Sequence, residues 1–464
     1  MSNTMPTKNK IIAYRDLSQI VTMAGAYKKN GRNLLPQDLS IIENASVVFD
    51  QEKIIWIGPE KEFPLEFELT AMSASNSLSI ESHYYRGHVL TPELVDSHTH
   101  LVFGGDRSNE YALRLNGANY QEIADAGGGI LYSMKETNRL SAAELFALAK
   151  QRIETMATYG IGTIEIKSGY GLNYIKEREI SEVIFDLKKF FAPQVQIINT
   201  FMAAHAVPPE FSNSTQYIDE VVAPLLRELG KNSIDLVDIF HEQNYFSDED
   251  LRKIFALARE LDIPCKSHAD EFNNNHGAKL AVEQGAISVD HLLQTDDEGI
   301  MALSKSNTVA TLLPGTGLFL GKNMALARKF LDAGVRVAIA SDYNPGSCHC
   351  DNLLLLASIA APTYHMNLGE LWAAITLNAA HALGLYDQGA LLIGEEVTKN
   401  PGGPTNAKAN ALHGLNVFGN ITSNITKNTF RPRFSLFKCN NINQITYNWG
   451  KNLALCALPA LPVL

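Results

Sequence analysis

The chain has 464 residues, 45% of them hydrophobic and 19% charged, and a formal net charge of -11 at pH 7. This length allows a large globular domain and a smaller accessory domain, whereas the acidic balance argues against a nucleic-acid partner, because phosphate contacts need basic surfaces. No apolar run approaches the ~18 residues of a membrane span, residues 1–10 are polar and unlike a secretory signal, and the five cysteines are scattered; we therefore expect a cytoplasmic protein.

The first predicted elements are short β-strands in residues 11–90. Residues 45–50 and 53–58 are apolar runs joined by a polar turn, which predicts a β-hairpin. Much later, residues 389–396 have the pattern of a turn followed by a strand that could return to this region. We therefore predict a small β-sandwich domain built from residues 1–89 and 386–464.

From residue 90 the pattern changes to strands that alternate with helices. Eight apolar, β-branched runs end near His100, residues 168–170, His205, residues 241–242, His268, His291, residues 314–315 and Asp342. Helical patterns lie at residues 142–159, 177–191, 248–261, 277–284, 296–304 and 325–333. Eight such units predict a closed (β/α)8 barrel over residues 90–385, with its polar strand ends on the rim where barrel enzymes build their sites.

The C-terminal third is less regular. A helix is predicted over residues 368–383, and residues 397–433 are rich in Asn, Gly, Pro and Thr, which indicates a surface insertion or loop. Residues 434–437 and 445–447 are candidate further strands. The apolar tail, residues 453–464, fits no predicted element.

Three of the strand ends carry candidate metal ligands. His98 and His100 are two residues apart, so on a strand their side chains point the same way. His268 ends the fifth strand and Asp342 the eighth; strands 1 and 8 are neighbours in a closed barrel and strand 5 faces them. Three imidazoles and a carboxylate suit Zn²⁺ or Fe²⁺ rather than Mg²⁺. Such a metal makes hydroxide available at neutral pH, which favours hydrolysis as the reaction class.

Two further rim residues are candidates for proton transfer. Glu271 lies three residues after His268 and could take a proton from a water beside the metal; alternatively, it orients His268. His291 ends the sixth strand and is a candidate for substrate contact or proton transfer. Lys167 lies on strand 2 rather than on strand 4, where a bridging carboxylated lysine would belong, so we predict one metal ion.

Five sequence motifs resemble those of the imidazolonepropionases, a family of the amidohydrolase superfamily that acts third in histidine degradation. The motifs are PELVDSHTHLVFGGDR (residues 92–107), EIKSGYGL (165–172), AHAVP (204–208), HADEF (268–272) and DYNPGS (342–347). The resemblance covers residues 40–395. It implies an enzyme that acts on a small molecule, hydrolysing 4-imidazolone-5-propanoate to N-formimidoyl-L-glutamate. We expect this enzyme to be a homodimer.

The same resemblance implies roles for individual residues. One zinc or iron ion per subunit would be held by His98, His100, His268 and Asp342. Substrate or product would contact Arg107, Tyr170, His205, Glu271, Asn344, Gly346 and Ser347. The substrate carries a carboxylate tail, for which the planar guanidinium of Arg107 offers a bidentate partner; a surface salt bridge is the simpler alternative for this arginine.

Some features depart from the family pattern. Residues 273–276 replace a more glycine-rich stretch, the Cys-His-Cys run at 348–350 is unusual, and the insertion at 397–433 interrupts the return to the β domain. Two other functions therefore stay open. One is a mononuclear amidohydrolase that acts on a purine, a pyrimidine or another cyclic amide; the other is a catalytically silent metal-binding protein.

Overall fold

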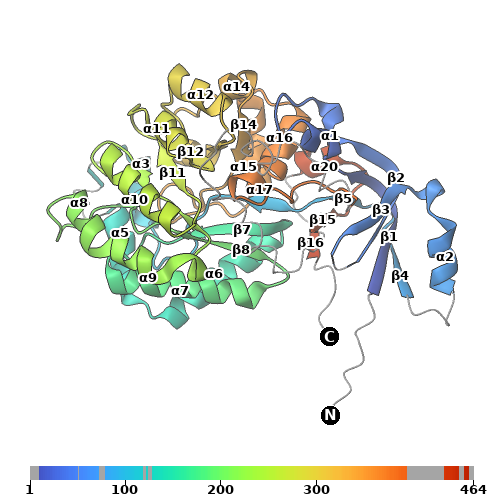
Figure 1. The fold of residues 1–464 in the computed structure, drawn as a ribbon, viewed down its shortest axis with the longest axis horizontal. Helices are drawn as coiled ribbons and strands as arrows, with labels where there is room; N and C mark the ends of the chain where they lie inside the picture. Colours follow the sequence, from blue (N-terminus) through green and yellow to red (C-terminus); the bar gives the residue numbers. More distant parts are fainter. Residues whose placement is uncertain are drawn as a thin grey trace, which may run out of the picture.

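The structure is a computed structural model that describes residues 10–50, 52–72, 79–118, 122–123, 128–393, 433–448 and 454–458. A β-sheet lies at one end of the molecule, and a ring of helices around short parallel strands forms the larger part (Figure 1). None of the helices in these ranges has both the length and the apolar character that crossing a membrane requires.

The sheet at one end joins segments that are far apart in the sequence. Its strands are β1 (Lys10–Val21), β2 (Ile41–Phe49), β3 (Ile54–Pro59), β4 (Ser79–Tyr84), β5 (Val89–Pro92), β15 (Phe434–Phe437) and β16 (Ala454–Leu458). The order is β16-β15-β5-β1-β2-β3, with β4 parallel to β1. The predicted hairpin is confirmed, since β2 and β3 pair antiparallel, and β15 pairs antiparallel with β5. Ile393 bridges Ile54, so the chain does return to this sheet.

The barrel strands run parallel in two sheets that meet at both seams. One sheet has β6 (Leu94–Asp96), β7 (Ile161–Lys167), β8 (Gln196–Phe201) and β9 (Leu236–Val237); the other has β10 (Phe240–His241), β11 (Lys266–Ala269), β12 (Ser288–His291), β13 (Val309–Leu312) and β14 (Arg336–Ile339). Bridges Val237–Cys265 and Thr99–Tyr343 connect the sheets. Because β9 and β10 together occupy the fourth position, the strands form the predicted (β/α)8 barrel.

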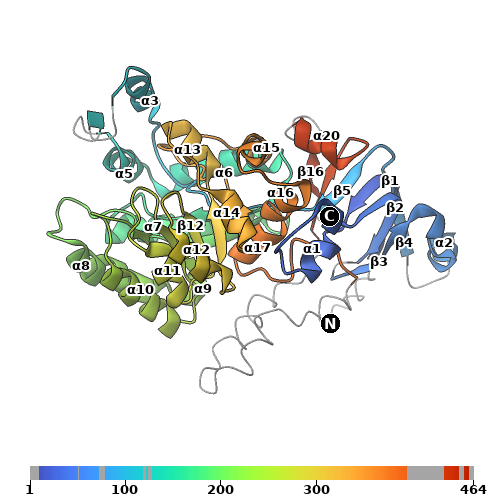
Figure 2. The same ribbon diagram turned by 90° about the horizontal axis from the view of Figure 1, so that it is seen from above.

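Helices surround these strands, and Figure 2 shows α3 and α5 standing out from the barrel on one side. The helices near the barrel are α3 (Ser108–Leu115), α5 (Ile130–Arg139), α6 (Ala142–Ala157), α7 (Tyr174–Phe191), α8 (Ser214–Tyr217), α9 (Ala223–Ser233), α10 (Asp248–Glu260), α11 (Gly277–Glu283), α12 (Asp297–Ser304), α13 (Pro314–Leu320), α14 (Ala327–Asp332), α15 (Leu353–Thr363), α16 (Leu368–Ala374) and α17 (Leu377–Ala382). Short helices α1 (Ala24–Lys28), α2 (Leu65–Met72) and α20 (Ile442–Tyr447) accompany the end sheet.

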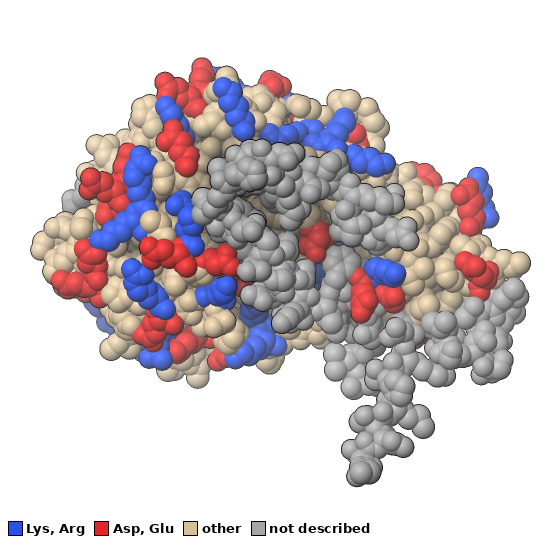
Figure 3. Space-filling view, viewed as in Figure 1, with Lys and Arg blue, Asp and Glu red and all other residues tan. Residues whose placement is uncertain are grey.

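Local capping explains where several of these helices begin. Ser141 accepts a hydrogen bond from the backbone N–H of Glu144, whose carboxylate in turn accepts from Ser141, and this capping box starts α6. Ser247 and Asp250 start α10 in the same way. On the face seen in Figure 3, acidic and basic side chains alternate over the visible part of the barrel, as on a solvated surface.

Two predicted elements are wrong and others lie outside the described residues. The helix predicted over residues 368–383 is two helices, α16 and α17. Thr376 lies between them with φ -131° and ψ -88°, values outside the helical region that interrupt the helix. Residues 445–447 are not a strand but part of α20: Asn441 caps this helix, and Ile442 and Ile445, three residues apart, are both buried on one side of it. The strand at 434–437 is confirmed as β15. Apart from Arg433, the predicted insertion at 397–433 lies outside the described residues.

Candidate metal centre and active site

The four predicted metal ligands lie at the same rim of the barrel. His98 and His100 follow β6, His268 is in β11, and Asp342 follows β14; each side chain is buried. His98 Nε2 is 3.5 Å and His100 Nε2 is 3.7 Å from Asp342 Oδ1. Single ligand atoms of these three residues lie within 4.8 Å of one another, as do those of His98, His268 and His291. His98 therefore links the two groups into one cluster.

The donor atoms of this cluster fit a divalent metal. His98 donates from Nδ1 to Asp290 Oδ2 at 2.7 Å, which leaves Nε2 as the atom that faces the cluster. Neither His98 Nε2 nor His268 Nε2 has a hydrogen-bond partner among the described residues, although both are buried. Burial, and then the nearby Lys167 charge, holds the pKa of His98 well below its usual value. Buried neutral imidazoles with unpartnered nitrogens have the lone pairs that zinc or iron needs.

A network of buried charges supports the cluster from inside the barrel. Lys167 Nζ is 2.6 Å from Asp238 and 2.8 Å from Glu165, and Lys266 Nζ is 3.1 Å from both Glu165 and Asp290. Burial lowers the pKa of Lys167, but the carboxylates around it raise that pKa overall above its usual value. Asp290 binds His98, and Asp238 Oδ2 lies 3.1 Å from His268 Nδ1. The rings of two predicted ligands, His98 and His268, are therefore each oriented by a buried carboxylate.

A cavity of about 660 Å³, including its open mouth, lies above the metal cluster. The predicted site residues that line it are His100, Arg107, Tyr170, His205, His268, Glu271, His291, Asp342, Asn344, Gly346 and Ser347. Of the predicted set, only His98 is outside the lining, because it is fully buried beneath the cavity. The structure therefore brings together predicted residues from six of the eight predicted strand ends or the loops that follow them.

Arg107 lies against the cavity and is already paired. Its Nε donates to Glu110 Oε2 at 2.8 Å, and its Nη2 is 2.7 Å from the same oxygen. A Cβ at position 346 would lie 1.8 Å from Arg107 Nη1, so a side chain there would displace the guanidinium, and only Gly346 fits. The guanidinium predicted to bind a substrate carboxylate is therefore paired through Nε and Nη2 with a carboxylate of the protein itself, in a largely buried ion pair.

Glu271 and His291 face each other beside the metal cluster. Glu271 Oε2 is 3.5 Å from His291 Nδ1, and both side chains are buried. Burial, and then the nearby charge of Asp342, raises the pKa of Glu271 to about 8. His291 and Asp342 both have positive φ, 79° and 50°, a conformation that non-glycine residues adopt at a cost and that often marks functional sites. A carboxyl group that titrates near neutral pH can both take up and release a proton during a reaction.

The other predicted substrate contacts are held in place by their neighbours. The rings of His100 and His205 are stacked with centroids 4.9 Å apart, and Tyr170 is 5.4 Å from His205. Burial lowers the pKa of His205 to about 3, so its ring is neutral. Asn344 accepts hydrogen bonds from the backbone N–H groups of Gly346 and Ser347, both at 2.8 Å. The Asn344 side chain therefore shapes the loop that forms one wall of the cavity.

Comparison with known proteins decides the family. The family model described as "Amidohydrolase family" matches residues 89–396. The chain is 37% identical to the imidazolonepropionase of Bdellovibrio bacteriovorus over 386 residues, 83% of this chain and 88% of that protein. It is 42% identical to the imidazolonepropionase of Idiomarina loihiensis over 360 residues, 76% of this chain and 84% of that protein. The chain belongs to the imidazolonepropionase family.

Two solved structures of much lower sequence identity share the fold of this family member. A variant of atrazine chlorohydrolase from Arthrobacter aurescens, complexed with zinc and atraton, aligns with a TM-score of 0.65 at 14% identity, covering 97% of this chain and 92% of that one. Ochratoxinase from A. niger aligns with a TM-score of 0.58 at 16% identity, covering 84% and 88%. At this identity the likeness concerns the fold alone.

Sequence reasoning missed several residues of the site in this imidazolonepropionase-family chain. The cavity is also lined by Arg114, Ile130, Phe240, Tyr245, Phe272 and Leu320. Arg114 donates from Nη1 to the carbonyl of Gly346 at 3.0 Å, so a second guanidinium lies beside that of Arg107. The buried carboxylates Asp238 and Asp290 were also missed. A signal for such buried charges was present in β7, because Glu165 and Lys167 interrupt a strand that is otherwise mostly apolar.

We expect Asp290→Asn to weaken metal binding. The variant keeps the shape of the side chain but removes the charge that holds His98 by its Nδ1 hydrogen. Loss of such a supporting carboxylate typically costs about 10- to 100-fold in metal affinity. Competition with a chromophoric chelator measures this, with Asp297→Asn, an exposed carboxylate on α12, as the control. Equal affinity in Asp290→Asn and wild type would show that Asp290 has no such role.

Proposed function

We propose that this protein hydrolyses 4-imidazolone-5-propanoate to N-formimidoyl-L-glutamate, the third step of histidine degradation. In this reaction water adds to the ring carbonyl carbon and the ring C–N bond breaks, which gives a new carboxylate and a formimidoyl nitrogen. The observation that carries the proposal is one cavity that is lined by the Arg107 guanidinium and lies above the cluster of His98, His100, His268 and Asp342. Membership of the imidazolonepropionase family supports the same reaction.

We assign one zinc or iron ion per chain to His98, His100, His268 and Asp342. When bound, such an ion polarises a carbonyl and lowers the pKa of a water molecule, which supplies a nucleophile at neutral pH. Asp342 Oδ2 accepts a hydrogen bond from Thr316 at 2.5 Å, so Oδ1 is the oxygen directed at the histidines. The ion pairs of Lys167 with buried carboxylates support a single ion, since its amine is engaged and away from a bridging position.

Proton transfer is assigned to Glu271 and His291. Glu271 takes a proton from the attacking water and returns it to the ring nitrogen as the C–N bond breaks, and His291 orients the ring carbonyl. The 3.5 Å separation of Glu271 Oε2 and His291 Nδ1 allows the two groups to contact the same substrate atoms. The opposite assignment, with His291 as the proton carrier, predicts an active Glu271→Gln and an inactive His291→Ala variant.

Substrate selection is assigned to the other wall of the cavity. Arg107 binds the propionate carboxylate through Nη1, the nitrogen that Glu110 does not engage. Tyr170 and His205 contact the ring or the tail from the mouths of strands 2 and 3. The loop containing Asn344, Gly346 and Ser347 closes the side of the cavity near Arg107 and contacts substrate or product.

Turnover of a set of cyclic amides tests the proposed function. The purified protein is assayed with imidazolone propionate, adenine, cytosine and guanine, and its metal content is measured in parallel. We expect turnover of imidazolone propionate alone. Turnover of a nucleobase instead would indicate another amidohydrolase activity, and bound metal without any turnover would indicate a silent binding protein. Sedimentation of the same preparation tests the expected homodimer.

We expect Arg107→Ala to impair substrate recognition without emptying the metal site. Truncating a charged contact in a partly buried pocket costs about 2–5 kcal/mol, which corresponds to a loss in kcat/KM of roughly tens-fold to thousands-fold. Arg107→Lys should recover only part of this, because an ammonium lacks the planar fork. Steady-state kinetics with metal analysis checks the result, with the exposed Arg139→Ala as the control.

A substrate analogue that lacks the carboxylate separates recognition from structure. Wild type should process this analogue poorly, and Arg107→Ala should process it no worse than wild type does. Removing Arg107 also leaves the carboxylate of Glu110 without its closest partner, so the melting temperature of each variant is measured. Equal impairment of both compounds in Arg107→Ala would make Arg107 a structural residue.

A further inference from the structure

Glu242 is a buried charge that the proposed mechanism does not use. It follows β10, at the end of the fourth barrel strand, and its relative exposure is 2%. Among the described residues, no Lys, Arg or His lies within 4.0 Å of its carboxylate oxygens, although the more distant Lys322 charge interacts with it. A buried carboxylate without a directly paired cation is costly unless several hydrogen bonds stabilise it. Its hydrogen-bond partners therefore indicate what it does.

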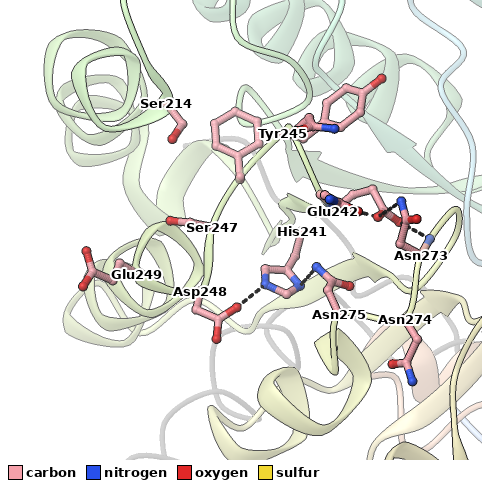
Figure 4. A pocket seen from close by; sticks show the side chains of 13 residues that line it. Ser214, His241, Glu242, Tyr245, Ser247, Asp248, Glu249, Asn273, Asn274 and Asn275 are labelled. Carbon is pink, nitrogen blue, oxygen red and sulfur yellow. Dashed lines mark hydrogen bonds and ion pairs between the residues drawn. The ribbon is translucent and has the colours of Figure 1, made fainter.

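The carboxylate of Glu242 binds the turn that carries Glu271. Its Oε2 accepts hydrogen bonds from the backbone N–H groups of Glu271, at 3.1 Å, and Phe272, at 2.9 Å. Its Oε1 accepts from the backbone of Gln243 at 2.8 Å and from the side-chain amide of Asn273 at 3.1 Å, the second of which is visible in Figure 4. Converging N–H groups form an anion-binding nest, here occupied by a side chain of the protein itself.

The turn formed by residues 271–273 lies between two cavities. Glu271 and Phe272 line the substrate cavity, whereas Asn273 lines a neighbouring polar pocket together with His241 and Glu242 (Figure 4). Glu242 thus holds the turn from the side opposite to the reaction. On the cavity side, the carboxyl group of Glu271 is within 3.5 Å of His291.

The residue before Glu271 is also fixed. Asp270 has a positive φ of 52°, and its carboxylate accepts hydrogen bonds from the backbone of Gly277, at 2.9 Å, and from the hydroxyl of Thr295, at 2.9 Å. These bonds tie the start of the turn to α11 and to the segment that precedes α12, but they do not reach the backbone of Glu271 or Phe272. Among the described residues, Glu242 is the acceptor that holds the backbone N–H groups of Glu271 and Phe272.

We propose that Glu242 is a positioning residue that holds Glu271 at the proton-transfer position through the backbone N–H groups of residues 271 and 272. This inference rests on the proposed function, because it assigns Glu242 a part in the same reaction. Glu242 itself does not line the substrate cavity, so its effect on the reaction passes through Glu271.

The isosteric variant Glu242→Gln tests the proposal. A glutamine replaces one acceptor oxygen by an NH₂ donor. In one orientation this NH₂ faces the N–H groups of Glu271 and Phe272, and in the other it faces those of Gln243 and Asn273. We expect kcat to fall by about tenfold to a hundredfold, the effect of a small misplacement of a catalytic group, with KM and metal content unchanged. Glu249→Gln, which changes an exposed carboxylate in the first turn of α10, is the control and should be fully active.

A double-mutant cycle separates positioning from a general structural role. If Glu242 acts through Glu271, then Glu242→Gln should cause little further loss in a Glu271→Gln background, because residues that act as a unit are not additive. Asn273→Ala removes one hydrogen bond to Glu242 from an exposed position and should lower kcat less, but in the same way. It serves as the second test if Glu242→Gln fails to fold.

Several outcomes would overturn the inference. They are an unchanged kcat in Glu242→Gln, additive losses in the double variant, a change confined to KM, loss of metal, or a fully active Asn273→Ala beside an unfolded Glu242→Gln. Wild-type protein that does not hydrolyse imidazolone propionate would instead overturn the proposed function. The two failures are therefore distinguishable within one set of assays.

Discussion

The Asp342→Ala and His268→Ala variants should each lose bound metal and turnover together. Asp342 supplies the carboxylate oxygen nearest to His98 and His100, and His268 supplies an unpartnered buried nitrogen from the opposite strand. Without His268 the remaining ligands come from one side of the barrel, and without Asp342 the cluster loses its only carboxylate among the proposed ligands. A catalytic metal contributes several kcal/mol to the reaction, so we expect kcat/KM to fall by about a thousandfold or more.

Metal analysis and kinetics on the same preparations check this result. Wild type should contain one ion per chain, and Asp332→Ala, which removes an exposed carboxylate, should match it. A variant of Asp342 or His268 that keeps both metal and activity would refute the ligand assignment. Two ions per chain in wild type would refute the single-metal assignment and would require a second ligand set.

The barrel could be predicted from the sequence because its signal repeats. Each apolar strand is followed by a polar rim and an amphipathic helix, so an error in one unit does not change the prediction for the whole. The C-terminal region has no such repetition. Residues 445–447 are β-branched and aromatic, and only the cap at Asn441 and the three-residue spacing of buried isoleucines identify a helix. The division into residues 90–385 and a composite β domain stays a prediction.

The rim residues could also be predicted, because parallel strands bring their carboxyl ends to one face. The supporting contacts could not be predicted in the same way. Asp290 binds His98 only because the closed barrel brings strands far apart in the sequence together, and Glu242 binds residues 271 and 272 only because β10 and β11 are neighbours. A single sequence gives the residue types but not which buried charges face each other across the barrel.

The Glu271→Gln variant should keep its metal and lose most of its turnover. Glutamine preserves the size of the side chain and lies outside the proposed ligand set, so the metal cluster should be unaffected. It cannot accept and return a proton, a function for which burial prepares Glu271 by raising its pKa to about 8. General-base contributions are about a hundredfold or more in rate, and we expect kcat to fall by at least this factor.

Parallel kinetics of Glu271→Gln and His291→Ala decide which group carries the proton. The two side chains are 3.5 Å apart, so either one lies close enough to the same reacting atoms. If Glu271 is the carrier, Glu271→Gln is nearly inactive with full metal content, and His291→Ala retains more turnover. A fully active Glu271→Gln beside an inactive, metal-replete His291→Ala would exchange the two roles. Glu283→Gln, an exposed carboxylate at the end of α11, should behave as wild type, because it contacts neither the cavity nor the metal cluster.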